Sequence, residues 1–127
     1  MYKYYNPNPL GKRTGDCVVR AICKATNAGW LDIYLGLCLD GAYMGDWGNT
    51  NSVWSAYLRD RGFERQAIPN TCPDCYTIED FANDNPKGTF VVATGTHAVC
   101  IKDGVIYDSW DSSREVPVYY FKEAKQE

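Results

Sequence analysis

The stretch THAVCIKDGVIYDSW, residues 96–110, contains the only histidine of the chain, His97, and places two short apolar runs around Asp103 and Gly104. An Asp-Gly pair between alternating apolar runs is a strong signal for a β-hairpin, because a two-residue type I′ turn needs positive φ at both central positions. This turn fixes the register of the two strands, with the opposing pairs Lys102–Val105, Ile101–Ile106, Cys100–Tyr107 and Val99–Asp108.

The same register brings His97 and Asp108 near each other at the open end of the hairpin. Side chains of a strand alternate between two faces, so one face carries His97, Val99, Ile101, Ile106, Asp108 and Trp110. His97 and Asp108 are diagonal neighbours on this face, about 7–8 Å apart at the backbone, a gap that two polar side chains can close. Trp110 lies across from His97 and would shield the contact. An imidazole oriented by a carboxylate supplies two of the three groups of a nucleophilic triad.

Length and composition limit the classes to which the chain can belong. Its 127 residues predict a single domain, 1–127, with one hydrophobic core. The net charge of −3 gives no electrostatic basis for binding nucleic acid or an anionic membrane. No apolar run is long enough to cross a bilayer, and the opening MYKYYNPNP lacks the pattern of a signal peptide. We therefore expect a cytoplasmic protein, whose six cysteines are free thiols, metal ligands or a catalytic group rather than a disulfide framework.

Helical patterns come first along the chain, and strand patterns follow. Residues 1–15 are expected to be extended or turning, Asp16 is expected to cap the first helix, and Thr77 and Asp80 have the spacing of a capping box. Pro117 places the last strand at a sheet edge, because proline cannot donate to a ladder. The predicted helices cover residues 15–27, about 30–40, 52–62 and 77–86, and the predicted strands cover residues 63–69, 89–95, 97–102, 105–110 and 115–121. This order predicts an α+β fold, with N-terminal helices packed on a C-terminal, mostly antiparallel sheet.

Cys17 is the candidate for the missing nucleophile. It follows Gly-Asp in the first turn of a predicted helix, where free backbone N–H groups and the helix dipole favour a negative charge. A cysteine at such a position beside a histidine can have its pKa lowered from about 8.5 to between roughly 3.5 and 7.5. Cys23, Cys38 and Cys100 fall inside predicted helices or on the opposite face of the hairpin, as small core residues do.

Each member of the candidate triad also has a purely structural interpretation. Free cysteine is often simply buried, and a lone histidine on an apolar face is more often a core residue than a base. Asp111 competes with Asp108 as the partner of His97, but it falls in the next turn and on the other face. The chain order of Cys17, His97 and Asp108 favours the catalytic interpretation.

The motifs GDCVVRAI, GTHAV and YDSW, in this order, resemble those of the papain-like cysteine peptidases. Papain carries its third catalytic residue in an Asn-Ser-Trp triplet, and aspartate in that place is familiar from the small peptidase domains that process bacteriocins. The longer pattern from NPNP to YDSWDS is similar to short proteins of Firmicutes and their phages. The resemblance implies a papain-like fold, with Cys17 as nucleophile, His97 as general base and then acid, Asp108 as the residue that orients the imidazole, and Trp110 as its shield.

The chain departs from the papain-like pattern at the oxyanion hole. Those enzymes place a glutamine a short way before the cysteine, and Gly11 stands there instead. Asn8 is the candidate replacement, with the backbone N–H of Cys17 as second donor, although an asparagine beside a proline is also a common turn former. Loss of one such donor costs roughly 2.7–4 kcal/mol of transition-state stabilisation, so a chain without a substitute would be a slow enzyme or a pseudoenzyme.

Two further features of the sequence leave their interpretation open. Cys72 and Cys75 form a single C-x-x-C, which is compatible with two loop cysteines, a labile disulfide or a metal site shared between chains. The tryptophans Trp30, Trp47 and Trp54 could line a substrate cleft, although aromatic residues at helical spacing are more often core. No metal ion or other cofactor is expected.

The sequence therefore predicts a small cysteine peptidase that cleaves amide or isopeptide bonds of a peptide or protein through Cys17, His97 and Asp108. An acyl transferase of the same fold would use the same residues. A second hypothesis is a non-catalytic phage or prophage protein that binds or inhibits a host factor on a papain-like scaffold. A third is a redox or metal module centred on Cys72 and Cys75. Substrate and oligomeric state do not follow from the sequence.

Overall fold

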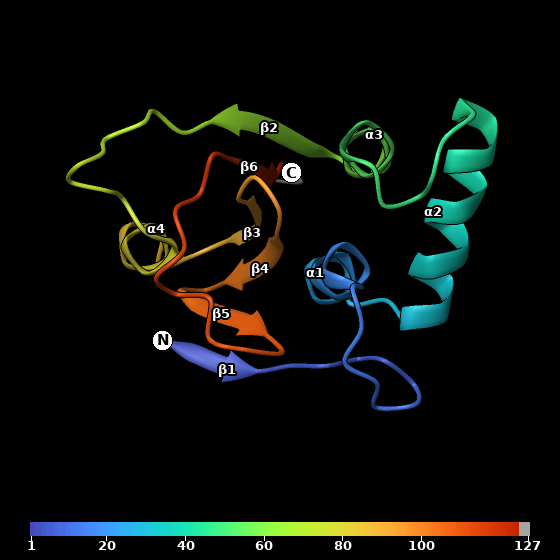
Figure 1. The fold of residues 1–127 in the computed structure, drawn as a ribbon, viewed down its shortest axis with the longest axis horizontal. Coiled ribbons are helices and arrows are strands. Elements are labelled where there is room, and N and C mark those ends of the chain that lie inside the picture. Colours follow the sequence, from blue (N-terminus) through green and yellow to red (C-terminus); the bar gives the residue numbers. More distant parts are fainter. Residues whose placement is uncertain (125–127) are drawn as a thin grey trace.

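The computed structural model describes residues 1–124, which form a six-stranded sheet with helices on both of its faces (Figure 1). The strand order is β1-β5-β4-β3-β6-β2. Strand β1 pairs with β5 in parallel and all other neighbours are antiparallel, so the predicted α+β class with a mostly antiparallel sheet is confirmed. The helices are α1 (Cys17–Thr26), α2 (Trp30–Met44), α3 (Asn51–Asp60) and α4 (Ile78–Asp84), and the strands are β1 (Tyr2–Tyr4), β2 (Phe63–Ala67), β3 (Thr89–Ala93), β4 (Ala98–Lys102), β5 (Val105–Asp108) and β6 (Tyr119–Glu123).

The hairpin of β4 and β5 has the register that its turn chemistry predicts. Lys102 pairs with Val105 and Ile101 with Ile106, and the turn residues Asp103 and Gly104 have φ of 50° and 77°. Positive φ at both central positions is the property of a type I′ turn for which Asp-Gly is suited. The turn therefore sets which residues stand at the open end of the hairpin.

Local signals also account for helix boundaries. Helix α1 ends where Asn27 adopts the left-handed conformation with φ of 57°. The capping box before α4 is present, because Thr77 and Asp80 each accept a hydrogen bond from the other's backbone N–H. Helix α2 runs to Met44, beyond the predicted end near residue 40, before Gly45 closes it with φ of 71°.

The first and last strands of the chain differ most from the prediction. Strand β6 lies inside the sheet, between β3 and β2, so the predicted edge position is wrong. The physical reason is that Pro117 precedes the first paired residue, Tyr119, and therefore removes no ladder hydrogen bond. Strand β1, within the segment expected to be extended or turning, adds a short parallel edge beside β5.

Two apolar clusters cover the two faces of the sheet. Helices α1 and α3 pack on the face that carries Val91, Cys100 and Phe121, and α2 packs on α1 and α3 from outside. Helix α4 packs on the other face, against Phe90, Val92, Val99, Ile101 and Ile106. Since α4 follows β2 in the chain, the helices are not all N-terminal to the sheet, and they enclose it from both sides (Figure 1).

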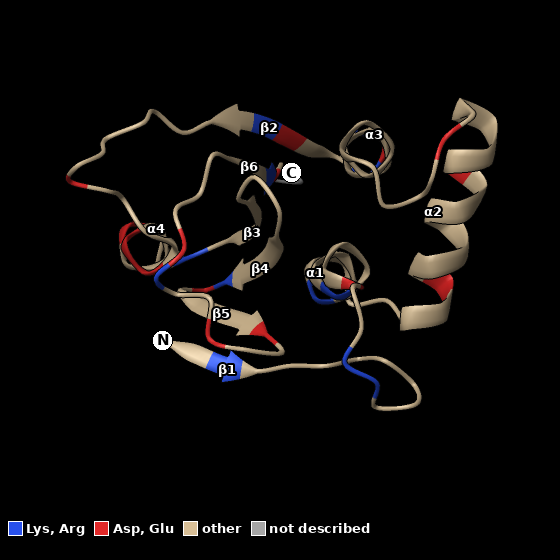
Figure 2. Cartoon of the chain, in the orientation of Figure 1, with Lys and Arg blue, Asp and Glu red and all other residues tan. Residues whose placement is uncertain are grey.

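Basic and acidic residues are interspersed along the described part of the chain. Lysine and arginine are distributed over several helices, strands and loops, and acidic residues stand among them (Figure 2). Within residues 1–124, none of the helices combines the length and the apolar character needed to cross a membrane.

Candidate active site

Cys17 and His97 meet where the start of α1 lies against the open end of the hairpin. Cys17 is the first residue of α1, and His97 directly precedes β4. Both line a pocket of about 260 Å³. Cys17 is partly buried, and the proximity of His97 and of the Ala98 backbone favours its ionised form. The two residues that the sequence proposes as nucleophile and base are thus brought together.

Asp108 completes the arrangement that the hairpin register predicts. It is the last residue of β5, its side chain is fully buried, and its Oδ2 lies 2.6 Å from His97 Nε2. Because Nε2 is bonded to Asp108, Nδ1 is the ring nitrogen that remains for Cys17. An imidazole held at one nitrogen by a carboxylate and directed at a thiol with the other is the geometry of a nucleophilic triad.

The electrostatics of the site favour a thiolate–imidazolium pair. Burial of the Cys17 thiol works against ionisation, but hydrogen bonds from His97 and Ala98, with the charges of His97 and Arg20, outweigh it and lower the pKa of Cys17. Burial likewise opposes protonation of His97, but Asp108 and Cys17 outweigh it and raise the pKa of His97 to about 9. A lowered thiol pKa and a raised imidazole pKa leave a pH range in which both groups are charged.

Of the three other free cysteines, Cys38 is exposed, so its predicted core position is wrong, and the other two have the opposite character to Cys17. Cys23 lies inside α1 and Cys100 inside β4, and both are buried. Burial raises the pKa of each thiol to about 12. They are therefore protonated core residues at neutral pH, as expected from their positions, and Cys17 differs from them in its chemistry.

Arg20 is a member of the site that sequence reasoning missed. It is 4% exposed and lies one turn beyond Cys17 on α1. Its Nη2 and Nε donate to Asp108 Oδ1 over 2.9 and 3.2 Å, and its Nη1 donates to Asp16 Oδ1 over 2.7 Å. Asp16 Oδ2 accepts a hydrogen bond of 2.9 Å from Trp30 Nε1. A largely buried series of polar contacts thus runs from Trp30 of α2 through α1 to Asp108.

These polar contacts also change the role expected for Asp16. The residue stands at the N-cap position of α1, but its carboxylate makes no capping hydrogen bond, so the predicted side-chain cap is wrong. Both carboxylate oxygens are engaged by Arg20 and Trp30 instead. The first backbone N–H groups of α1, at the wall of the Cys17 pocket, therefore receive no cap from this side chain.

Two serines complete the hydrogen bonding of Asp108. The fully buried hydroxyl of Ser112 donates to Oδ2 over 2.7 Å, and the backbone N–H of Ser109 donates to Oδ1 over 2.8 Å. Burial alone would raise the pKa of Asp108, but the bonds from His97 and Ser112, with the charges of His97 and Arg20, hold it below its ordinary value. Asp108 is thus an ionised, fully bonded anchor for the imidazole. Nothing in the stretch YDSWDSS, residues 107–113, indicated the contact between Ser112 and Asp108.

Trp110 lies over the imidazole, as the hairpin register predicts. Its ring centroid is 4.9 Å from that of His97, and the two planes are inclined by 42°. The predicted common face holds only in part, because Val99 and Ile106 pack toward α4 whereas Asp108 bonds to Arg20 of α1. Asp108 ends β5, so its side chain lies at the end of the sheet, within reach of α1.

The structure does not bring Asn8 into the Cys17 pocket. Asn8 lines a neighbouring hollow, and its Oδ1 accepts the backbone N–H groups of Leu10 and Lys12, as in the turn-forming interpretation. Two other asparagines, Asn49 and Asn51, line the pocket of Cys17 itself. The Oδ1 of Asn51 accepts the Trp54 indole N–H. Asn49 lines both hollows.

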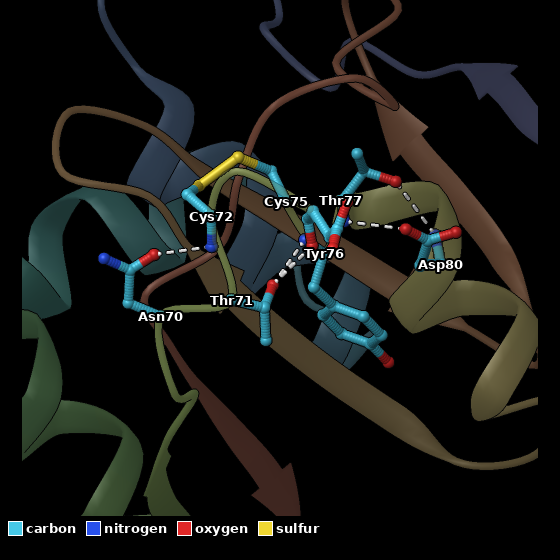
Figure 3. Close-up of a disulfide and its surroundings, with 8 residues drawn as sticks. Asn70, Thr71, Cys72, Cys75, Tyr76, Thr77 and Asp80 are labelled. Carbon is cyan, nitrogen blue, oxygen red and sulfur yellow. Dashed lines mark hydrogen bonds between the residues drawn. A yellow bond between two sulfur atoms is a disulfide. The ribbon is translucent and has the colours of Figure 1, made fainter.

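Cys72 and Cys75 are joined by a disulfide in the loop between β2 and α4, with their Cα atoms 4.2 Å apart (Figure 3). Thr71 and Asn70 bond to the backbone of the same loop, which leads into the capping box of α4. Neither cysteine lines the pocket of Cys17. No group of three or more metal-ligating side chains occurs among residues 1–124.

Comparisons with protein families, with curated proteins and with solved structures found no match to this chain.

Proposed function

We propose that the chain is a thiol hydrolase, a small papain-like cysteine peptidase that acts on amide or isopeptide bonds. The observation that carries the proposal is that His97, bonded to Asp108 over 2.6 Å, lines one pocket with Cys17 and lowers the pKa of that thiol. Asp108 is held by three further protein groups, so the imidazole has a fixed orientation. Such second-layer contacts fix catalytic geometry.

In the first step, the Cys17 thiolate attacks the carbonyl carbon of the substrate and forms a C–S bond. The backbone N–H of Cys17, at the start of α1, and the side-chain amide of Asn49, a residue that lines the pocket, would donate to the oxyanion that develops there. The His97 imidazolium then donates its proton to the leaving amine as the C–N bond breaks.

In the second step, neutral His97 accepts a proton from water, and the hydroxide attacks the thioester. The acid is released, the thiolate is restored, and the imidazole is again protonated. An acyl transferase would pass the acyl group to an amine at this stage instead. Asp108 stays ionised throughout, since its role is to orient and stabilise the imidazolium.

A mixture of peptides from a digested proteome, incubated with the protein and analysed for new termini, tests the proposal. New termini should appear with the wild type and with Cys38→Ala, whose thiol lies outside the Cys17 pocket. They should disappear with Cys17→Ala. Cleavage that persists without Cys17 contradicts the proposal, and absence of cleavage by a reactive Cys17 favours the transferase or the non-catalytic binding protein.

A further inference from the structure

We infer that the hollow beside the Cys17 pocket is a subsite for a large apolar side chain, preferably aromatic, of the substrate residue next to the cleaved bond. This inference rests on the proposed function. The hollow has a volume of about 470 Å³, and Gly15 and Asn49 line both it and the Cys17 pocket. An apolar cavity of roughly 150 Å³ is enough to hold benzene, so an aromatic side chain and part of its backbone fit here.

The walls of the subsite are aromatic and aliphatic. Trp30 and Tyr34, one turn apart on α2, stack with centroids 4.9 Å apart and planes 12° apart. Leu37, 2% exposed, lies one turn further along the same helix and lines the bottom of the hollow. Trp47 stands at the rim and is 79% exposed. An aromatic side chain in the hollow would cover apolar surface that water now contacts, which is the main source of favourable binding energy for such a group.

Two polar side chains that line the hollow, those of Asp16 and Asn8, are already paired. Asp16 is bonded to Arg20 and Trp30, and Asn8 Oδ1 to two backbone N–H groups. No buried side-chain nitrogen or oxygen in the described part of the chain lacks a partner. Lys12 is exposed at the edge. Since no buried polar atom is free to bind a polar ligand, the hollow favours an apolar ligand.

Two glycines hold the outer wall in place. A Cβ at Gly48 would lie 2.8 Å from the backbone of Leu37, and a Cβ at Gly41 would lie 2.6 Å from the carbonyl oxygen of Asp46. The loop after α2 therefore packs directly on that helix, and Asp46 N bonds to Gly41 O over 2.8 Å. This close contact fixes the segment that carries Trp47 and Asn49, so the subsite exists before substrate binds.

The test compares two alkylating probes with the same reactive group, chloroacetamide and N-(2-phenylethyl)-2-chloroacetamide. Each second-order rate at Cys17 is divided by the rate of the same probe with glutathione, which removes differences in intrinsic reactivity. Arg20 and Lys24 lie between Cys17 and Cys38, so tryptic peptides report the two thiols separately. With the wild type, the phenylethyl probe should be favoured at Cys17 by about tenfold or more, as burial of an apolar group in a formed pocket allows.

Trp47→Ala should remove most of that preference, because it opens the rim without touching the core. Tyr43→Ala is the matched control, since Tyr43 is an aromatic residue of α2, is 84% exposed and does not line the hollow. Two outcomes would overturn the inference. In the first, the two probes have equal glutathione-normalised rates at Cys17 of the wild type. In the second, the preference for the phenylethyl probe is the same in Trp47→Ala as in the wild type. Failure of the proposed function gives a different result. Cys17 would then react slowly with chloroacetamide itself. The ratio of the two probe rates at Cys17 would still show whether the hollow favours an aromatic group.

Discussion

Replacing Arg20 with methionine perturbs the buried network that supports the triad. Arg20 is 4% exposed and its guanidinium donates to both Asp16 and Asp108. Methionine retains much of the side-chain volume but leaves the buried Asp16 carboxylate without a cation and Asp108 with His97 alone. Removing one partner of a buried ion pair costs about 3–5 kcal/mol, a large part of the roughly 5–15 kcal/mol that stabilises a domain.

The assay is urea unfolding at pH 7 of the wild type, Arg20→Met and the control Arg59→Met, whose arginine is exposed on α3. We expect Arg59→Met to change the free energy of unfolding by no more than about 0.5 kcal/mol. Arg20→Lys keeps the charge but loses the forked geometry, so its stability should fall between those of the wild type and Arg20→Met. This variant keeps the experiment informative if Arg20→Met does not fold.

A double-mutant cycle separates the network from simple packing. In an Asp108→Asn background one of the two carboxylates that Arg20 neutralises is gone, so Arg20→Met should cost at least about 1 kcal/mol less than in the wild type. Equal costs in the two backgrounds, or a cost of Arg20→Met within about 1 kcal/mol of that of Arg59→Met, would refute the reasoning that Arg20 acts through Asp108.

Three further predictions concern the neighbours of the imidazole. Ser112→Ala removes a buried hydrogen bond to the charged Asp108 and should lower the free energy of unfolding by about 1.5–3 kcal/mol in urea; an unchanged stability would contradict the bond. Trp110→Ala, at a side chain 40% exposed, should change stability little but reduce the rate of Cys17 alkylation at pH 6, since water then reaches His97; an unchanged rate would show that the indole shields nothing. In Cys17→Ala no thiol titrates beside His97, and the Asp108 bond still raises the pKa of His97 above its unfolded value of 6.5. The stabilisation from the imidazolium is then fully present below pH 6.5 and is lost as pH rises through the folded pKa; a stability of this variant that is flat or rising between pH 6.5 and 9 would contradict the assignment.

The parts of the site that follow from local chemistry were predictable. Asp103 and Gly104 specify a turn, the turn specifies a register, and the register brings Asp108 to His97. Cys17 was predictable because the start of a helix is a local property of the sequence. The packing of α1 on the sheet brings Cys17 to His97 and Asp108. For this packing, the only indication in the sequence was the resemblance to papain-like peptidases.

The parts that depend on tertiary packing were not predictable. Arg20 lies within an apolar helical pattern, and nothing local indicates that its guanidinium bridges residues 16 and 108. For the same reason the local sequence predicts Asp16 as a cap, although the Trp30 indole and the Arg20 guanidinium occupy its oxygens. Asn8 was a candidate by distance along the chain, whereas Asn49 reaches the pocket from the loop between α2 and α3. Contacts across separate elements carry no periodic signal.

The pH dependence of Cys17 alkylation by iodoacetamide, located by peptide mass mapping in the wild type and in His97→Ala, tests the central claim most directly. If the thiolate–imidazolium pair exists, wild-type Cys17 reacts rapidly and selectively at pH 6, while the exposed Cys38 serves as an internal reference. In His97→Ala the rate at pH 6 should collapse and rise only as pH approaches about 8.5, the value of an ordinary thiol. A Cys17 that titrates near 8.5 in both proteins, or that is inert in both, would contradict the catalytic account.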